Sequence, residues 1–153
     1  MVLTKPLYEL VYRLVNCTDL FVTHSDHRAT TGAGRKIVGL APGNHGFHVH
    51  EFGDCTAADG SSAGGHFNPT NQPHAGPDAD ARHVGDMGNI EADASGAAKL
   101  DYLDHSMSLA NDDRSIIGRS VVVHAKADDF KSQPAGDSGA RVACGVIGRA
   151  KSQ

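Results

Sequence analysis

The stretch GFHVHEFGDC, residues 46–55, places two histidines one residue apart and follows them with an acidic turn that carries a cysteine. Successive side chains of a β-strand point to opposite faces, so His48 and His50 would share one face while Phe47 and Val49 share the other. Two imidazoles on one face suit a shared metal ion. The same pattern also fits an edge strand with a solvated polar face, so the pair alone does not decide.

Length and composition favour a single all-β domain. The 153 residues show no internal repeat and suffice for one domain of ordinary size, so residues 1–153 are expected to fold as one unit. The chain has 18 Gly, 6 Pro and no Trp, which indicates many turns between short strands rather than a helical bundle.

Six segments have the residue pattern of short strands. They are residues 36–41, 45–51, 87–93, 97–103, 120–126 and 141–147. Turn-forming sequences such as APGN, ADASG and ANDD lie among them. The pattern predicts two faces around one core.

Charge and hydropathy argue against several functions. The formal net charge of −4 offers no basic surface for nucleic acid or an anionic membrane. No stretch has the length of a transmembrane helix, and the N-terminus lacks the segments of a leader peptide. We therefore expect a cytoplasmic protein, although a chain whose leader has been removed would look the same.

A long polar segment, residues 52–86, separates two of the predicted strands. A loop of this length within one domain is usually functional or disordered. Its histidines and one aspartate form a complete tetrahedral donor set for Zn²⁺, namely His66, His74, His83 and Asp86. The alternative is a flexible loop with scattered surface histidines.

A further histidine, His124, lies within the segment SVVVHAK, residues 120–126. Val121 and Val123 would face the core, which turns Val122 and His124 outward. Beside His48 and His50 on a neighbouring strand, His124 would give three imidazoles on one surface, with room for a fourth from the loop. An all-imidazole set suits copper and redox chemistry.

Five blocks of the sequence resemble motifs of the copper,zinc superoxide dismutases, in that family's order. They are HGFHVHEFGD, SAGGHFNP, RHVGDMGNI, IIGRSVVVHAKADD and GARVACGVIG, within residues 37–150. The resemblance implies a Greek-key β-barrel or sandwich of about eight antiparallel strands with two long functional loops.

The same resemblance implies two metal sites that share one histidine. The implied copper ligands are His48, His50, His66 and His124. The implied zinc ligands are His66, His74, His83 and Asp86. In the implied reaction two superoxide anions become dioxygen and hydrogen peroxide while copper is reduced and reoxidised, and His66 takes up and returns a proton.

Other residues match family positions outside the ligand sets. Asp128 matches the carboxylate that hydrogen-bonds a copper-ligand and a zinc-ligand histidine, and Arg141 matches the arginine beside the open copper position. Cys55 and Cys144 match the intrasubunit disulfide. Cys17 is expected to be a buried or free thiol.

The resemblance also implies partners and a substrate. Besides superoxide, we expect a homodimer and, for copper delivery, a copper chaperone. Residues that match the family's two-fold contact are Phe52, Gly53, Ile117, Gly118 and Ile147. Lys126 and Lys131 are expected either to attract the anion or to form a solvated rim. Leu40 and Leu109 match the residues that close the two barrel ends.

Residues 1–36 lack the glycine-punctuated strands with which the family begins. Leu7, Leu10, Val11, Leu14 and Val15 instead have helical spacing over about two turns. Three alternatives follow: strands that pair despite the sequence, an incomplete barrel, or an altered reading frame. His24 and His27 match nothing in the family and are expected at the surface.

A second function from a different class remains open. The chain could be a non-catalytic copper- and zinc-binding module, such as a metal buffer or a chaperone-like domain. A copper chaperone would need a pair of thiols for transfer, and no Cys-x-x-Cys occurs. The four-histidine copper set together with Arg141 favours the enzyme.

Overall fold

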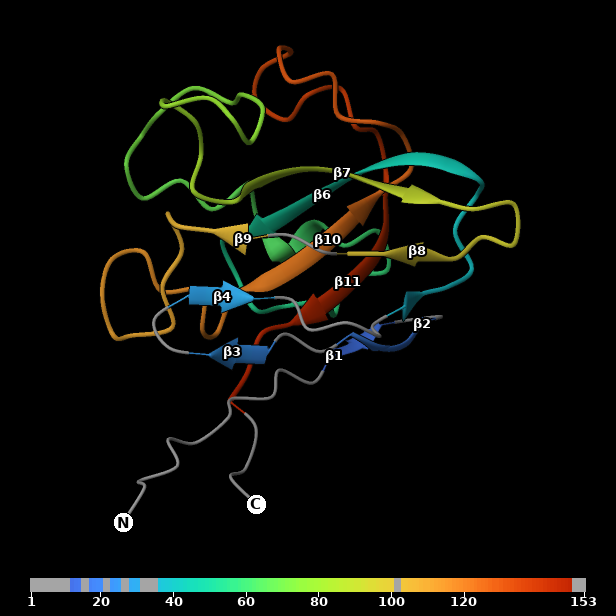
Figure 1. Ribbon diagram of the computed structural model, residues 1–153, viewed down its shortest axis with the longest axis horizontal. Helices are drawn as coiled ribbons and strands as arrows, with labels where there is room; N and C mark the ends of the chain where they lie inside the picture. Colours follow the sequence, from blue (N-terminus) through green and yellow to red (C-terminus); the bar gives the residue numbers. More distant parts are fainter. Residues whose placement is uncertain are drawn as a thin grey trace.

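The computed structural model describes residues 12–14, 17–20, 23–25, 28–30, 36–100 and 103–149. This part of the chain is β-strand and loop, with one short 3-10 helix, η1 (Ser61–Ala63) (Figure 1). The strands are β1 (Tyr12–Leu14), β2 (Cys17–Leu20), β3 (Thr23–Ser25), β4 (Arg28–Thr30), β5 (Lys36–Ile37), β6 (Gly43–His50), β7 (Asp86–Ala92), β8 (Ala98–Lys99), β9 (Leu103–Asp104), β10 (Ser120–His124) and β11 (Arg141–Val146).

The central element is a six-stranded antiparallel sheet in the order β11-β10-β6-β7-β8-β5. A two-stranded unit, β1-β2, contacts both edges of this sheet, because β1 lies against β11 and β2 lies against β5. A three-stranded sheet, β3-β4-β9, completes the described strands. The curled antiparallel arrangement fits the predicted Greek-key β-barrel.

The described N-terminal strands favour the first of the three alternatives left by the sequence, while an altered reading frame stays untested. Strands β1 to β4 lie within residues 1–36 and pair despite the absence of the family's pattern. The helical spacing does not produce a helix in the described part of this segment, because residues 12–14 form a strand. Leu7, Leu10, Val11, Val15 and His27 lie outside the described residues. That residues 1–153 form one domain stays a prediction.

Two predicted strands are shorter than expected. The segment 36–41 forms a strand only at its first two residues, because Gly39 takes a positive φ of 84°. Leu40 then donates its N–H to the carbonyl of Gly96, which lies between β7 and β8. The segment 97–103 divides into β8, which pairs with β5 and β7, and β9, which pairs with β4. The chain therefore changes sheets between them.

Alternation along β6 and β10 separates the core from the opposite face. Phe47, Val49, Val121 and Val123 belong to the main hydrophobic cluster, which Leu40 joins and against which Leu109 packs, as expected of residues that close the barrel. Side chains on the other face include Val122 and three ligand candidates, His48, His50 and His124. There His48 pairs in register with Val122, and the pair is fully buried.

Two long loops meet over this opposite face, and they appear at the same end of the barrel (Figure 1). The first loop (residues 51–85) connects β6 to β7, and the second loop (residues 125–140) connects β10 to β11. Hydrogen bonds join them, for example from His74 to Asp128. Within the described ranges, no helix is long and apolar enough to cross a bilayer.

Candidate metal centre

Two groups of four side chains converge beneath the loops. The ligand atoms of each group lie within 4.8 Å of one another, and every member is buried. One group is His48, His50, His66 and His124; the other is His66, His74, His83 and Asp86. The structure thus assembles the same two sets that the sequence predicts, with His66 in both.

The second group has the spacing of a tetrahedral site. Oδ1 of Asp86 lies 2.8 Å from Nδ1 of His66 and 3.0 Å from Nδ1 of His74. Nδ1 of His83 lies 3.2 Å from the same oxygen. Ligand atoms around a tetrahedral Zn²⁺ stand about 3.3 Å apart, given zinc–nitrogen distances of about 2.0 Å. This donor set therefore fits zinc.

The other carboxylate oxygen of Asp86 binds the backbone of the first loop. Oδ2 accepts backbone N–H groups from Ala75 at 3.1 Å and from His83 at 3.0 Å. These bonds fix the carboxylate so that Oδ1 faces the three imidazoles. Both donors belong to the first loop. The orientation of the Asp86 carboxylate therefore depends on that loop being folded around it.

Four imidazole nitrogens are buried without a hydrogen-bond partner. They are Nδ1 of His48, Nε2 of His66, Nδ1 of His74 and Nδ1 of His83. A buried polar atom without a partner costs free energy, so native proteins rarely tolerate several at one place. Each of these atoms faces its cluster, and a bound metal ion would give each one a partner. The residues fit copper and zinc on this ground.

The first group is held by its outer nitrogens. His50 donates Nδ1–H to the Gly64 carbonyl at 3.0 Å, and His124 donates Nδ1–H to the Gly139 carbonyl at 3.1 Å. Their Nε2 atoms consequently turn toward each other, 3.3 Å apart. Because one ring nitrogen is fixed as a donor, the other is left as an acceptor for a metal.

Asp128 joins the two groups from the second loop. Its carboxylate accepts from Nε2 of His48 at 2.7 Å and from Nε2 of His74 at 2.9 Å. The role predicted for Asp128 is therefore supported by its geometry. Asn89 of β7 in turn holds the Asp128 backbone, since it accepts the N–H at 2.7 Å and donates to the carbonyl at 2.9 Å.

Burial keeps the first group uncharged. Desolvation, with a smaller contribution from the neighbouring His66, lowers the pKa of His50 to about 2. Burial likewise lowers the pKa of His66 and of His124 to about 4. These imidazoles are neutral at pH 7, which is the protonation state that binds a metal.

The carboxylates near the second group stay ionised. Burial opposes the charge of Asp86, but the hydrogen bond from His66 and the close Nδ1 atoms of His74 and His83 outweigh it and hold the pKa of Asp86 well below its ordinary value. The pKa of Asp128 is lowered in the same way by its bonds to His48 and His74. Two buried negative charges favour a cation here.

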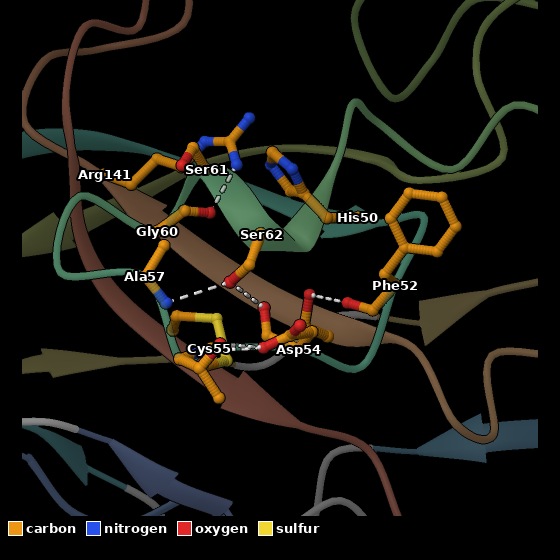
Figure 2. The surroundings of a disulfide bond; sticks show 12 residues. His50, Phe52, Asp54, Cys55, Ala57, Gly60, Ser61, Ser62 and Arg141 are labelled. Carbon is orange, nitrogen blue, oxygen red and sulfur yellow. Dashed lines mark hydrogen bonds between the residues drawn. A yellow bond between two sulfur atoms is a disulfide. The ribbon is translucent and has the colours of Figure 1, made fainter.

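Arg141 lies beside the first group, where the sequence expects it. Its guanidinium donates to the carbonyls of Gly60 and Gly64 in the first loop. Figure 2 shows Arg141 and His50 on the same side of the disulfide loop. The predicted Cys55–Cys144 disulfide is present, with Cα atoms 5.7 Å apart, and it fastens the first loop to β11.

The two lysines considered for attraction of an anion are exposed in the second loop. Lys126 lies 3.7 Å from the Asp137 carboxylate, and both side chains are more than half exposed. Such a pair contributes little to stability. For Cys17 and His24, only the backbone strands β2 and β3 are described, so their predicted environments stay predictions.

Several residues that hold the site carry no signal in the sequence. Asn89 and Gln133 act through side-chain amides on backbones 39 and 59 residues away. Gly136 acts through the room it leaves beside Asp128. None of these residues belongs to a ligand type or has a telling spacing, so only the folded chain identifies them.

Comparisons with known proteins agree with this geometry. The family model for copper/zinc superoxide dismutase matches residues 18–147. The extracellular superoxide dismutase [Cu-Zn] of Brugia pahangi is 48% identical over 131 residues, which cover 80% of this chain and 64% of that protein. This chain thus spans less than two thirds of that relative's length.

A solved structure matches nearly the whole fold. The crystal structure of the clock protein EA4 superposes with a TM-score of 0.82 at 38% identity, covering 98% of this chain and 99% of that one. One expectation is overturned by these comparisons. The expected cytoplasmic location is wrong, because the 48% identical relative is named as an extracellular superoxide dismutase.

Proposed function

The chain belongs to the copper/zinc superoxide dismutase family, and on this premise we propose that it converts superoxide to dioxygen and hydrogen peroxide. The proposed copper ligands are His48, His50, His66 and His124. The proposed zinc ligands are His66, His74, His83 and Asp86.

The shared position of His66 is the observation that carries the proposal. Its Nδ1 lies 2.8 Å from Asp86 Oδ1 in the zinc set, while its Nε2 is buried without a partner on the copper side. The ring centre of His66 is 3.9 Å from that of His48 and 5.0 Å from that of His50. A single imidazole that faces two donor sets supports a two-metal centre.

The protein's part in the reaction follows from its fixed groups. When bound, copper supplies the one-electron chemistry, whereas zinc is redox-inactive. Nε2 of His66 has no protein partner, so it can hold the proton that peroxide formation consumes. Asp128 fixes the tautomers of His48 and His74 by accepting from their Nε2 atoms.

Arg141 is proposed to receive the anion. Superoxide carries one negative charge, and the chain as a whole has a net charge of −4, so attraction must be local. The guanidinium is held by two loop carbonyls and lies beside His50 (Figure 2). Arginine keeps its charge throughout the physiological pH range, which makes this attraction independent of pH there.

A homodimer is proposed from an exposed apolar face. Phe52 is 57% exposed and Val146 is 40% exposed, and Gly118 stands near Gly53. Ile147 differs from the other predicted contact residues, because its side chain is fully buried. Its backbone bonds within the same chain, where its carbonyl accepts from Gly118 and its N–H donates to Arg119. A copper chaperone stays a predicted partner.

Superoxide consumption by the metal-loaded protein tests the proposal. We expect rapid consumption at one copper and one zinc per chain. His48→Ala should reduce it by at least 100-fold, because the substitution removes a copper ligand and the partner of Asp128. His105→Ala is the matched control, since His105 is exposed and outside both groups, and it should keep full activity.

The second candidate is a metal-binding module without turnover. It is favoured by one comparison, in which a structure of this fold at 38% identity is that of a clock protein. Full occupancy by both metals without superoxide consumption would establish this alternative. Low occupancy of either metal under loading conditions would contradict both candidates.

A further inference from the structure

Gln133 of the second loop clasps the backbone of His74 in the first loop. Its Oε1 accepts the His74 N–H at 2.8 Å, and its Nε2 donates to the His74 carbonyl at 2.8 Å. One planar amide therefore satisfies both backbone groups of a residue 59 positions away. This pairing imitates a rung of a β-ladder, in which both groups of a residue are engaged at once.

His74 is consequently held from four directions. Its Nε2 bonds to Asp128 at 2.9 Å, and its Nδ1 faces the Asp86 carboxylate at 3.0 Å. Its two backbone groups complete the set through Gln133. The residue is 2% exposed, although it belongs to neither a strand nor a helix and lies in a polar part of the first loop. The second loop thus holds the ring through Asp128 and the backbone through Gln133.

The side-chain amides of Asn89 and Gln133 bind their backbone partners in the same way. Asn89 of β7 clasps the backbone of Asp128 with its side-chain amide, and Gln133 clasps the backbone of His74 in the same two-bond manner. The first clasp anchors Asp128 to the barrel. The second clasp anchors His74 to the loop that carries Asp128. A connected path therefore runs from β7 to the zinc set through two amides.

We propose that Gln133 is a positioning residue that keeps His74 at the zinc site and slows the release of zinc. The inference rests on the proposed function only in taking His74 as a zinc ligand. Without the clasp, the His74 backbone would be free to move away from the second loop while its ring remained tied to Asp128. The ring would then visit orientations in which Nδ1 no longer points at the metal.

The rate of zinc release from the copper- and zinc-loaded protein into excess chelator tests the inference. Gln133→Met keeps the length of the side chain and removes both hydrogen bonds, and it should speed release about 10-fold, in the range seen when groups around metal ligands are removed. Gln133→Glu keeps the acceptor and removes the donor, so its rate of zinc release should lie between the wild-type rate and that of Gln133→Met.

Gln72→Met is the matched control. Gln72 lies in the same loop as His74, but among the described residues its side chain bonds only to the Thr70 carbonyl of that loop, at 3.3 Å. Release from this variant should equal the wild-type rate. Wild-type rates in both Gln133 variants, or equal acceleration by Gln72→Met, would overturn the inference.

A spectrum separates positioning from general loosening. Co²⁺ in the zinc site reports ligand geometry through its visible bands, and Gln133→Met should alter them while Gln72→Met leaves them unchanged. Both readouts are independent of superoxide turnover. A protein that consumes no superoxide would contradict the proposed function and leave this inference intact, whereas zinc release indifferent to Gln133 would contradict the inference alone.

Discussion

Gly136 is a position of the second loop at which the metal centre leaves no room for a side chain. A Cβ atom built there would collide with Oδ1 of Asp128 and come within 2.7 Å of His74 Nε2. Its φ of 66° lies in the left-handed region, which glycine adopts without strain. The position thus requires glycine on two grounds, conformation and space.

Gly136→Ala should weaken zinc binding by about 10- to 100-fold, because the methyl group displaces the carboxylate that fixes His74. Gly139→Ala is the matched control. Gly139 has a φ of 78°, but its Cβ would meet only the flexible side chain of Lys126 at 3.2 Å, so it should cost about 1 kcal/mol of backbone strain and keep its zinc. Competition with a chelator measures both affinities, and equal affinities would refute the steric account.

The candidate ligands could be predicted residue by residue, because histidine and aspartate are themselves common metal-ligand types. Histidine pairs on a strand and histidines in a long loop restrict the possible metals, and the alternation of β6 and β10 places the imidazoles on one face. Asn89 and Gln133 could not be predicted, because an amide that clasps a distant backbone is indistinguishable in sequence from a surface amide.

At the scale of elements, the Arg82 side chain connects the first loop to β9 through hydrogen bonds and an ion pair. It donates to the carbonyls of Pro77, His83, Val84 and Asp86, all within or at the end of the first loop. It also donates to the Asp104 carboxylate at 2.7 Å. Asp104 is 5% exposed and the Arg82 side chain is 11% exposed, so this ion pair is largely buried.

The stability of the metal-free protein should depend on pH through Asp104. Burial opposes its charge, but bonds from Ser106 and the charge of Arg82 lower its folded pKa below the ordinary 3.8. Its contribution is therefore complete above pH 3.8 and disappears as pH falls through the lower folded value. Asp104→Asn should cost about 3 kcal/mol at pH 7 and progressively less below pH 3.8.

Denaturant unfolding of both proteins across pH 2 to 7 measures this difference. Other carboxylates titrate in both proteins, so the gap between the two curves isolates Asp104. A gap that stays constant with pH would contradict the ion pair as its cause.

The disulfide is the covalent tie between elements. It joins residues 89 positions apart, and a crosslink of that span contributes about 4 to 5 kcal/mol in the chain-entropy model. Replacing Cys55 and Cys144 together by Ser should lower the free energy of unfolding by about that amount. Activity should also fall, because the first loop supplies the carbonyls that hold Arg141. Unchanged stability and activity would show that packing alone fixes the loop.

Elements were predicted well where hydrophobic alternation is long. Strands β6, β7, β10 and β11 lie where the sequence puts them, because each has five or more residues with one apolar face. The short edge strands could not be delimited, since two paired residues leave no periodic signal. Strands β1 and β2 lie against the edges of the six-stranded sheet, whereas β3 and β4 pair with each other and β4 also pairs with β9. Such pairing depends on distant partners rather than on local pattern.

At the scale of the whole molecule, the exposed apolar face around Phe52 predicts association. Phe52→Glu should convert a dimer into a monomer, because it buries a charge against the same face of a second copy. Val142→Glu is the control, since Val142 is 46% exposed on β11 at the end away from Val146. Sedimentation measures both, and a wild-type protein that is already monomeric would refute the dimer.

The most direct test of the two-metal centre is anomalous diffraction at the copper and zinc absorption edges of metal-loaded crystals. We predict one copper peak among His48, His50, His66 and His124, and one zinc peak among His66, His74, His83 and Asp86. His66 should lie between the two peaks with one ring nitrogen facing each. A single peak, or the same metal at both positions after loading with both, would contradict the account.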